Sequence, residues 1–239
     1  MTRVRAAPAR STRSAAAGTS KLKPAAFLFD LDGTLVDTEA VWTRAIVDFV
    51  VSRGGKTTFE DILPTVIGRN WLDIDRGLHE RFPVIGDSNP MDDARELRVF
   101  YDAYAANPSS MRIEGTIAFF RRAASVAPCA IVSGSPHNDV VDAAKMCGID
   151  DCVSLVLGAG EYEAGKPSPS GFLRAAGLLG VDPARCVVVE DSEVGVASGV
   201  AAGMKVVALD RSTLVKQRFT GETWRVRDMS EIDFEKEFT

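Results

Sequence analysis

The feature that most constrains this chain is an apolar run that ends in two carboxylates two residues apart, Asp30 and Asp32. The run predicts a buried β-strand over residues 25–30, and residues two apart on a strand point to the same side. Two carboxylates about 4 Å apart repel each other by about 4 kcal/mol at an effective dielectric constant near 20. A cation that prefers oxygen ligands, such as Mg²⁺, removes this repulsion. The alternative is a strand end whose aspartates only cap the following turn.

The charge of the chain is unevenly distributed. Residues 1–24 carry six of the 28 Lys and Arg residues and no acid, which leaves 22 basic against 33 acidic side chains in the rest. A globular part this acidic is a poor partner for nucleic acid, and no apolar run reaches the length of a membrane span. We therefore expect neither nucleic acid nor a membrane as a partner, and we expect a monomer or weak dimer.

The basic tail, residues 1–24, predicts disorder because it offers almost nothing to bury. Its Arg-rich, acid-free composition is typical of an organellar transit peptide, but a floppy tail or a mis-set start site explains it equally well. The four cysteines form no C-x-x-C pair, which favours reduced thiols and a cytoplasmic location. Neither of the two histidines, His79 and His137, sits in a ligand cluster in the sequence, so we expect no zinc site.

Residues 38–107 carry helical patterns and no strong strand pattern. Asp37 or Thr38 is placed to cap the first of these helices. Apolar residues recur at helical spacing over residues 41–50, 62–66, 71–78 and 94–104. An insert that begins directly after a candidate catalytic loop is placed to form a lid. We therefore predict a helical cap domain over residues 38–107.

From Ile113 onward, helical and strand patterns alternate. Strands are predicted over residues 129–132, 153–157, 186–189 and 205–209. Helices are predicted over residues 116–127, 136–147, 168–179 and 194–202. Continuous apolar strands that alternate with helices predict an α/β fold, namely a doubly wound, Rossmann-like parallel sheet. The core domain is then discontinuous, with residues 25–37 and 108–239, and its ligands bind beyond the carboxyl ends of the strands.

Polar residues follow two more of the predicted strands. Ser133 and Gly134 combine a hydroxyl with backbone N–H groups that can approach an anion, although an ordinary helix cap has the same pattern. Glu190 and Asp191 repeat the arrangement of paired acids after an apolar run. Their alternative role is to begin a helix, since acids are favoured there by the helix dipole.

Lys166 lies in the run G-K-P-S-P, before a predicted helix. A lysine over clustered carboxylates would keep them ionised and would neutralise phosphoryl oxygens. Gly160, Gly165 and Lys166 also have the spacing of a phosphate-binding P-loop. However, Pro167 stands where that motif needs Ser or Thr, and Glu161 places negative charge inside the loop, so we reject the P-loop.

These groups together resemble the four motifs of the haloacid dehalogenase-like hydrolases, especially their phosphatase and beta-phosphoglucomutase-like branch. The matching runs are D-x-D-G-T at 30–34, Ser133 after its strand, G-K-P-x-P at 165–169 and E-D-S-x-x-G-x-x-S-G-x-x-A-G-M at 190–204. The resemblance covers residues 25–209. Many members of that family carry a helical cap at the place of the insert.

The resemblance implies a role for each strand-end residue. Asp30 would be the nucleophile, Asp32 the general acid/base, and Lys166 and Ser133 would bind the transferring phosphoryl group with Gly134. The implied Mg²⁺ ligands are Asp30, Asp32 through its backbone carbonyl, Glu190 and Asp191.

The cap offers one further candidate. The Gly68-Arg69 pair lies between helical segments and resembles a cap loop whose Arg reaches the non-reacting end of the substrate. The alternative is a Gly at a helix C-terminus followed by a solvated Arg69.

The function that these residues predict is Mg²⁺-dependent hydrolysis of a small phosphorylated metabolite, expected to be a sugar phosphate, through a phospho-aspartate. A sugar-phosphate mutase would use the same residues, whereas the D-G-T run disfavours a dehalogenase. A non-enzymatic alternative is a phospho-accepting receiver domain. That alternative needs an Asp at the end of the third strand, where this chain has Leu157-Gly158.

Overall fold

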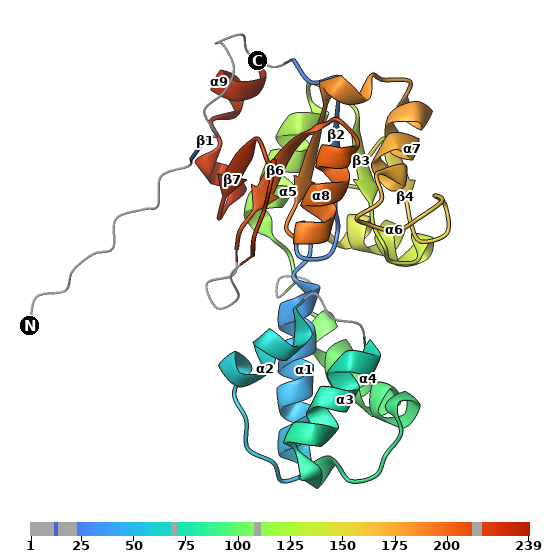
Figure 1. Cartoon of the computed structure of the whole chain (residues 1–239), viewed down its shortest axis with the longest axis vertical. Coiled ribbons are helices and arrows are strands. Elements are labelled where there is room, and N and C mark those ends of the chain that lie inside the picture. Colours follow the sequence, from blue (N-terminus) through green and yellow to red (C-terminus); the bar gives the residue numbers. More distant parts are fainter. Residues whose placement is uncertain (1–11, 14–22, 68–70, 108–110, 212–216) are drawn as a thin grey trace, which may run out of the picture.

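The protein has an α/β lobe and a helical lobe, drawn above and below each other in Figure 1. The computed structural model describes residues 12–13, 23–67, 71–107, 111–211 and 217–239. The chain leaves the α/β lobe after its first parallel strand, forms the helical lobe, and then returns. None of the helices in these described residues has the length and apolarity needed to cross a bilayer.

The sheet of the α/β lobe has, within the described residues, seven strands in the order β1-β7-β6-β5-β2-β3-β4. The parallel strands are β2 (Ala26–Phe29), β3 (Cys129–Val132), β4 (Leu155–Leu157), β5 (Cys186–Glu190), β6 (Lys205–Leu209) and β7 (Trp224–Val226). Phe29 at the end of β2 lies opposite Ile131 of β3 on one side and Val189 of β5 on the other. These three central strands therefore end at the same edge of the sheet.

Helices cover both faces of this sheet. They are α5 (Glu114–Ala124), α6 (His137–Met146), α7 (Ser170–Leu179), α8 (Glu193–Ala201) and the short α9 (Phe234–Phe238). Phe27 and Phe29 share one apolar cluster with α5, α6 and α9, whereas Leu28 between them belongs to a second cluster with α7 and α8. Because successive strand residues point to opposite faces, each strand is apolar throughout. The predicted doubly wound parallel sheet is confirmed.

One part of the basic tail differs from the prediction of disorder. Thr12 and Arg13 form the two-residue strand β1, which pairs antiparallel with β7. An edge strand such as β7 presents unpaired N–H and C=O groups, to which any extended segment can bind regardless of its side chains. The other tail residues, 1–11 and 14–22, lie outside the described residues.

The helical lobe is the inserted cap of the fold. It consists of α1 (Thr38–Ser52), α2 (Phe59–Val66), α3 (Trp71–Arg81), a 3₁₀ turn (Pro83–Ile85) and α4 (Pro90–Ala105). Their apolar faces meet in a cluster separate from the two clusters at the sheet. The core of this lobe includes Ile46, Phe49, Ile62, Leu78 and Leu97.

Capping residues set where these helices begin. The Asp37 side chain caps α1 by accepting from the backbone N–H of Ala40, at 3.2 Å. Helices α2 and α4 begin several residues earlier than their apolar patterns suggest. Thr58 forms a capping box for α2, and Asn89 caps α4. These caps make the first turn of each helix stable although it lacks the apolar pattern.

Candidate active site

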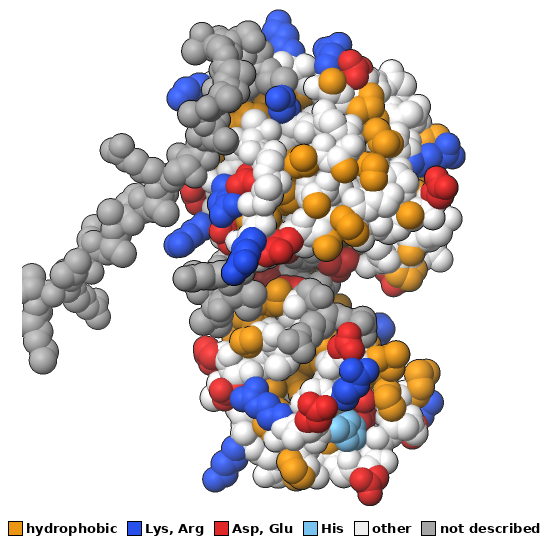
Figure 2. All heavy atoms as spheres, in the orientation of Figure 1, with side chains coloured by type: hydrophobic (Ala, Val, Ile, Leu, Met, Phe, Trp, Pro, Cys, Tyr) orange, Lys and Arg blue, Asp and Glu red, His pale blue; other side chains and the backbone are white. Residues whose placement is uncertain are grey.

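Three central strands bring polar side chains to the edge of the sheet from which the chain passes into α1 (Figure 1). Asp30 directly follows β2, Ser133 directly follows β3, and Glu190 is the last residue of β5. All three are buried. On the face drawn in Figure 2, acidic side chains gather along this edge, beside the junction of the two lobes.

Lys166 joins two of these strand ends. Its ammonium Nζ donates to Oδ1 of Asp30 and, at 2.5 Å, to Oε1 of Glu190. Burial on its own lowers the pKa of Lys166, but the two carboxylates raise it above its ordinary value overall. Lys166 therefore lies as a positive charge between two buried acids, over clustered carboxylates. Its side chain binds these acids and does not belong to a P-loop.

The Asp30 carboxyl is nevertheless costly to ionise. Burial raises its pKa to about 7, with Lys166 acting in the opposite direction and with the Glu190 and Asp32 carboxylates adding to the rise. One lysine thus does not balance the negative charge that the strand ends bring together. A further cation at this place would favour the ionised form.

Asp191 lies beside this pair and is positioned by two segments of the chain, residues 33–34 and Gln217. Its Oδ1 accepts from the hydroxyl of Thr34 at 3.1 Å, and its backbone carbonyl accepts from Nε2 of Gln217 at 2.6 Å. Gly33 lies against it with a φ of 86°, and a Cβ there would be 2.0 Å from Oδ2 of Asp191. Only glycine fits this close approach at a positive φ. Burial, then Glu190 and Asp30, raise the pKa of Asp191 well above its ordinary value.

Asp30, Glu190 and Asp191 can each offer one carboxylate oxygen, and these oxygens lie within 4.8 Å of one another. The second oxygen of Glu190 accepts from both the backbone N–H and the hydroxyl of Ser192, each at 2.9 Å. Hard divalent cations such as Mg²⁺ favour this all-oxygen donor set. The arrangement, with the pKa values of Asp30 and Asp191 raised, fits a bound cation.

Hydroxyl groups surround the carboxylate of Asp32. Thr38 at the start of α1 donates to Oδ1 at 3.0 Å, while Ser135 and Ser133 donate to Oδ2 at 2.8 Å and 3.3 Å. Ser133 also accepts from the backbone N–H of Ser135 at 3.0 Å. Asp32 is thus oriented by hydrogen bonds and has no lysine partner of the kind that Asp30 has among the described residues.

A cleft of about 610 Å³ opens beside Asp32, between the two lobes. Its walls include Ser135 and Asp139 from the α/β lobe and Arg98 and Tyr101 from α4 of the helical lobe. Arg98 and Tyr101 belong to no sequence motif, and only the packing of α4 brings them to this cleft. A Cβ added at Gly134, in the loop after β3, would meet no other atom within 4 Å. The predicted residue Arg69 lies outside the described residues.

A family model described as haloacid dehalogenase-like hydrolase matches residues 24–203, which include both acid pairs and Lys166. The chain belongs to the haloacid dehalogenase-like hydrolase family. This membership confirms the resemblance that the four motifs carry. Thr34, Thr38 and Ser135 lie inside the matched range, whereas Gln217 lies beyond it.

Two curated proteins and a solved structure are similar to most of this chain. Hexitol phosphatase A of Escherichia coli (strain K12) is 31% identical over 77% of this chain and 82% of its own length. The chloroplastic Protein SUPPRESSOR OF QUENCHING 1 of Arabidopsis thaliana is 30% identical over 78% of this chain, which spans only 18% of that protein. A crystal structure of a HAD family hydrolase from Deinococcus radiodurans R1, with bound phosphate and sodium, has a TM-score of 0.63 at 29% identity, covering 77% of this chain and 80% of that one. The chain thus spans most of hexitol phosphatase A but only a small part of the longer Arabidopsis protein.

Proposed function

We propose that the protein is a phosphatase that hydrolyses a small phosphorylated metabolite through a phospho-aspartate at Asp30. The observation that carries the proposal is the hydrogen bond from Lys166 to the buried Asp30. Asp32 lies two residues further along the chain and accepts hydrogen bonds from hydroxyl groups. A nucleophilic carboxylate and a separate acid/base are the two groups that this reaction requires. The similarity to a hexitol phosphatase supports a sugar or polyol phosphate as the substrate.

In the first step, a carboxylate oxygen of Asp30 attacks phosphorus, so that a new O–P bond forms as the bond to the leaving oxygen breaks. Asp32 gives its proton to that oxygen, which leaves as an alcohol. In the second step Asp32 takes a proton from water, and the water oxygen attacks phosphorus. Phosphate departs and the Asp30 carboxylate is regenerated.

The remaining residues hold and orient these groups. Lys166 balances charge on the phosphoryl oxygens, and Glu190 keeps the Lys166 ammonium in place through its 2.5 Å hydrogen bond. Thr38 and Ser135 fix the orientation of the Asp32 carboxyl. Ser133 and the backbone at Gly134 are proposed to bind the phosphoryl group.

Asp30, Glu190 and Asp191, together with the backbone carbonyl of Asp32, are the proposed Mg²⁺ ligands. All four donors are oxygens, and the carboxylate oxygens of Asp30, Glu190 and Asp191 lie within 4.8 Å of one another, which fits this ion. Mg²⁺ bound there supplies positive charge to the transferring phosphoryl group. Gly33 has a structural part in this site, since it lets the chain pass against Asp191.

The proposed test is a screen of phosphorylated metabolites that includes hexitol phosphates, hexose phosphates and p-nitrophenyl phosphate, each with Mg²⁺. We expect repeated release of free phosphate, with the highest kcat/KM on a sugar or polyol phosphate. A single transfer of phosphate to the protein without turnover would instead support the receiver-like alternative. An isomeric sugar phosphate as the product, seen by NMR, would replace the phosphatase with a mutase.

Two parts of the substrate site can be tested in the same screen. Arg98 and Tyr101 line the cleft near Asp32, so we propose that they contact the non-reacting part of the substrate. Arg69 is proposed for the same end of the substrate from the sequence alone. Replacing Arg98 or Arg69 by Ala should lower kcat/KM on the best metabolite and leave hydrolysis of p-nitrophenyl phosphate unchanged. Equal losses on both substrates would argue against substrate contact.

A further inference from the structure

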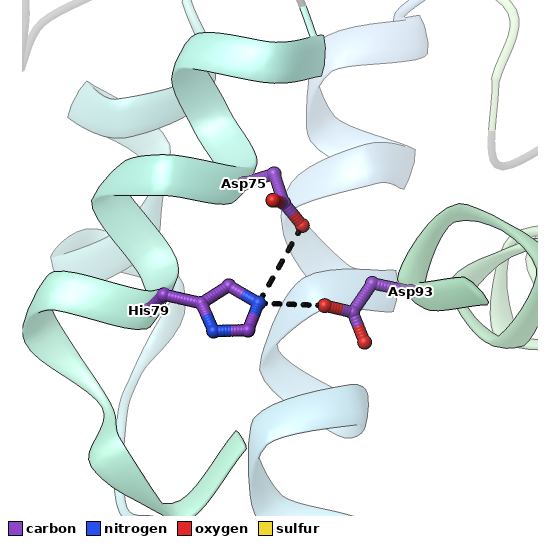
Figure 3. Close-up of side chains that lie close together, drawn as sticks. All are labelled: Asp75, His79 and Asp93. Carbon is purple, nitrogen blue, oxygen red and sulfur yellow. Dashed lines mark hydrogen bonds and ion pairs between the residues drawn. The ribbon is translucent and has the colours of Figure 1, made fainter. Parts of the chain in front are cut away.

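A second group of acidic and histidine side chains lies in the helical lobe (Figure 3). Asp75 and His79 project from α3, and Asp93 projects toward them from the first turn of α4. Nε2 of His79 is 2.7 Å from Oδ2 of Asp93 and 3.8 Å from Oδ1 of Asp75. The expectation that neither histidine has a ligand cluster is therefore wrong for His79. The cluster forms because residues four apart on a helix share a face, on which a second helix then packs.

The two aspartates are buried at this place without enough hydrogen-bond donors. Asp75 is 5% exposed and Asp93 is 1% exposed. Oδ1 of each carboxylate is buried and has no hydrogen-bond partner. A buried acceptor that lacks a donor costs about 1–3 kcal/mol, and more when it is charged. The unpartnered oxygen of Asp75 is the one directed at His79, whereas that of Asp93 points away from the ring (Figure 3). The cluster therefore has an unused, buried acceptor that faces Nε2 of His79.

The other ring nitrogen of His79 is already committed. Nδ1 lies 3.0 Å from the backbone carbonyl of Gly86, which can only accept, so Nδ1 carries the hydrogen. Histidines that bind metal ions usually donate their other N–H to a carbonyl in this way, which fixes the ring and its tautomer. The lone pair of Nε2 then faces the two carboxylates. A proton or a metal ion between Nε2 and the carboxylate oxygens removes the resulting repulsion.

The positively charged side chains near the cluster do not supply the missing charge and hydrogen-bond donors. Arg53 is 3.5 Å from Oδ1 of Asp93, but the same guanidinium pairs with Glu96 and donates to the carbonyl of Ile85 at 2.8 Å. Ser88 donates to Oδ2 of Asp93 at 3.0 Å and adds no charge. Burial raises the pKa of Asp75, with His79 opposing this rise and Asp93 adding to it.

We propose that Asp75, His79 and Asp93 form a binding site for a divalent transition-metal ion, for which Zn²⁺ is the fitting example. One imidazole nitrogen with two carboxylates is a donor set that Zn²⁺ accepts, whereas Mg²⁺ prefers oxygen ligands alone. Tetrahedral ligands about 2.1 Å from zinc lie about 3.4 Å apart, between the observed 2.7 Å and 3.8 Å. Three protein ligands leave the fourth position to water.

The bound ion would link α3 to α4 and would hold the chain at Gly86 between them through His79. It displaces any proton shared by Nε2 and the carboxylates, so metal binding releases protons. Because the ion binds the folded lobe, it stabilises that lobe by mass action. The site is separate from the strand-end carboxylates and does not depend on the proposed phosphatase reaction.

The first test is a Zn²⁺ titration of the full-length protein by calorimetry, after treatment with EDTA and in excess Mg²⁺ to occupy the strand-end acids. His79→Gln is compared with His137→Gln, which removes the only other histidine of the chain. We expect one Zn²⁺ per chain in the wild type and in His137→Gln, and at least tenfold weaker binding in His79→Gln and in Asp75→Asn. Equal Zn²⁺ binding in His79→Gln and His137→Gln would overturn the proposal.

The second test observes His79 in the unmodified sequence, and a variant at the other histidine serves only to assign the signals. With ¹⁵N-labelled histidine, the protein gives ring signals from two residues, and His137→Gln identifies which belong to His79. Zn²⁺ in excess Mg²⁺ should shift Nε2 of His79 and leave His137 in place. Unchanged His79 signals at saturating Zn²⁺ would show that the cluster holds only a proton and would overturn the proposal.

Discussion

The two acidic clusters of this protein solve the same electrostatic problem differently. At the strand ends, Lys166 reaches Asp30 and Glu190 from a separate loop. Hydroxyl or backbone donors reach the second oxygen of Glu190 and Oδ1 of Asp191. In the helical lobe, a single side chain, His79, contacts two carboxylates, and one oxygen of each carboxylate has no hydrogen-bond donor. A buried carboxylate cluster can thus carry part of its compensating charge within the chain, and the uncompensated part favours a bound cation.

The largest expected effect is on the reaction itself. Asp30→Asn keeps the size of the side chain but removes the nucleophile, so kcat on the best substrate should fall by at least about a thousandfold. Circular dichroism should stay unchanged, because Asp30 follows a strand and does not belong to an apolar cluster. Asp151→Asn, at an exposed acid, is the matched control. Activity within tenfold of the wild type in Asp30→Asn would refute the phospho-aspartate mechanism.

Removing the cation that belongs to the strand-end cluster should reveal its share of the compensation. Lys166→Met leaves Asp30 and Glu190 buried without their partner, and breaking such a pair costs about 3–5 kcal/mol. We expect this loss in urea unfolding at pH 7 without metal ions, and a smaller loss when Mg²⁺ is present. A variant as stable as the wild type in EDTA would show that Lys166 does not balance these acids.

Removing the proposed Mg²⁺ from the strand-end carboxylates should abolish most of the activity, whereas a change in the His79 cluster of the helical lobe should not. EDTA should lower activity by at least about a hundredfold, and Mg²⁺ should restore it and raise the melting temperature of the apoprotein. His79→Gln, measured with the same substrate and saturating Mg²⁺, should recover to the same extent as the wild type. Full activity after exhaustive chelation would rule out the proposed metal site.

The pKa of Asp30 predicts a pH dependence of stability with a definite sign. Because its folded-state pKa is raised from 3.8 to about 7, the folded protein holds more protons than the unfolded chain between these values. Metal-free stability should therefore fall as pH rises through this window, by about 1–3 kcal/mol relative to Asp30→Asn. Urea unfolding at pH 4.5 and 7.5 measures this difference. Parallel pH profiles for the wild type and Asp30→Asn would contradict it.

The smallest expected effect is in the helical lobe without metal. His79→Gln removes the partner of Asp93, and an unsatisfied buried acceptor costs about 1–3 kcal/mol. His137→Gln removes an exposed contact with Glu161, for which about 0–1 kcal/mol is expected. Adding Zn²⁺ should widen the gap between the two variants. If His79→Gln and His137→Gln had identical melting temperatures both with and without Zn²⁺, His79 would not hold the buried acids of the helical lobe.

The order of strands and helices could be predicted from the sequence, because apolar periodicity and capping are local properties. Each polar group that follows an apolar strand was recognisable for the same reason, as Asp30, Ser133 and Glu190 illustrate. Short elements gave no such signal. Strand β7 has three residues and α9 has five, and both depend on packing against the sheet and its apolar cluster.

The contacts between these groups were decided only by the tertiary structure. Nothing local indicates that Gln217 holds the backbone of Asp191, that Ser135 reaches Asp32, or that Glu190 shares Lys166 with Asp30. His79 illustrates the same limit, because its spacing from Asp75 is visible in the sequence but its contact with Asp93 is not. Local sequence is enough to show which residues end strands or share a helix face, since both properties depend on neighbours along the chain. Which charges meet depends on how the elements pack, and packing brings together residues that are far apart in sequence.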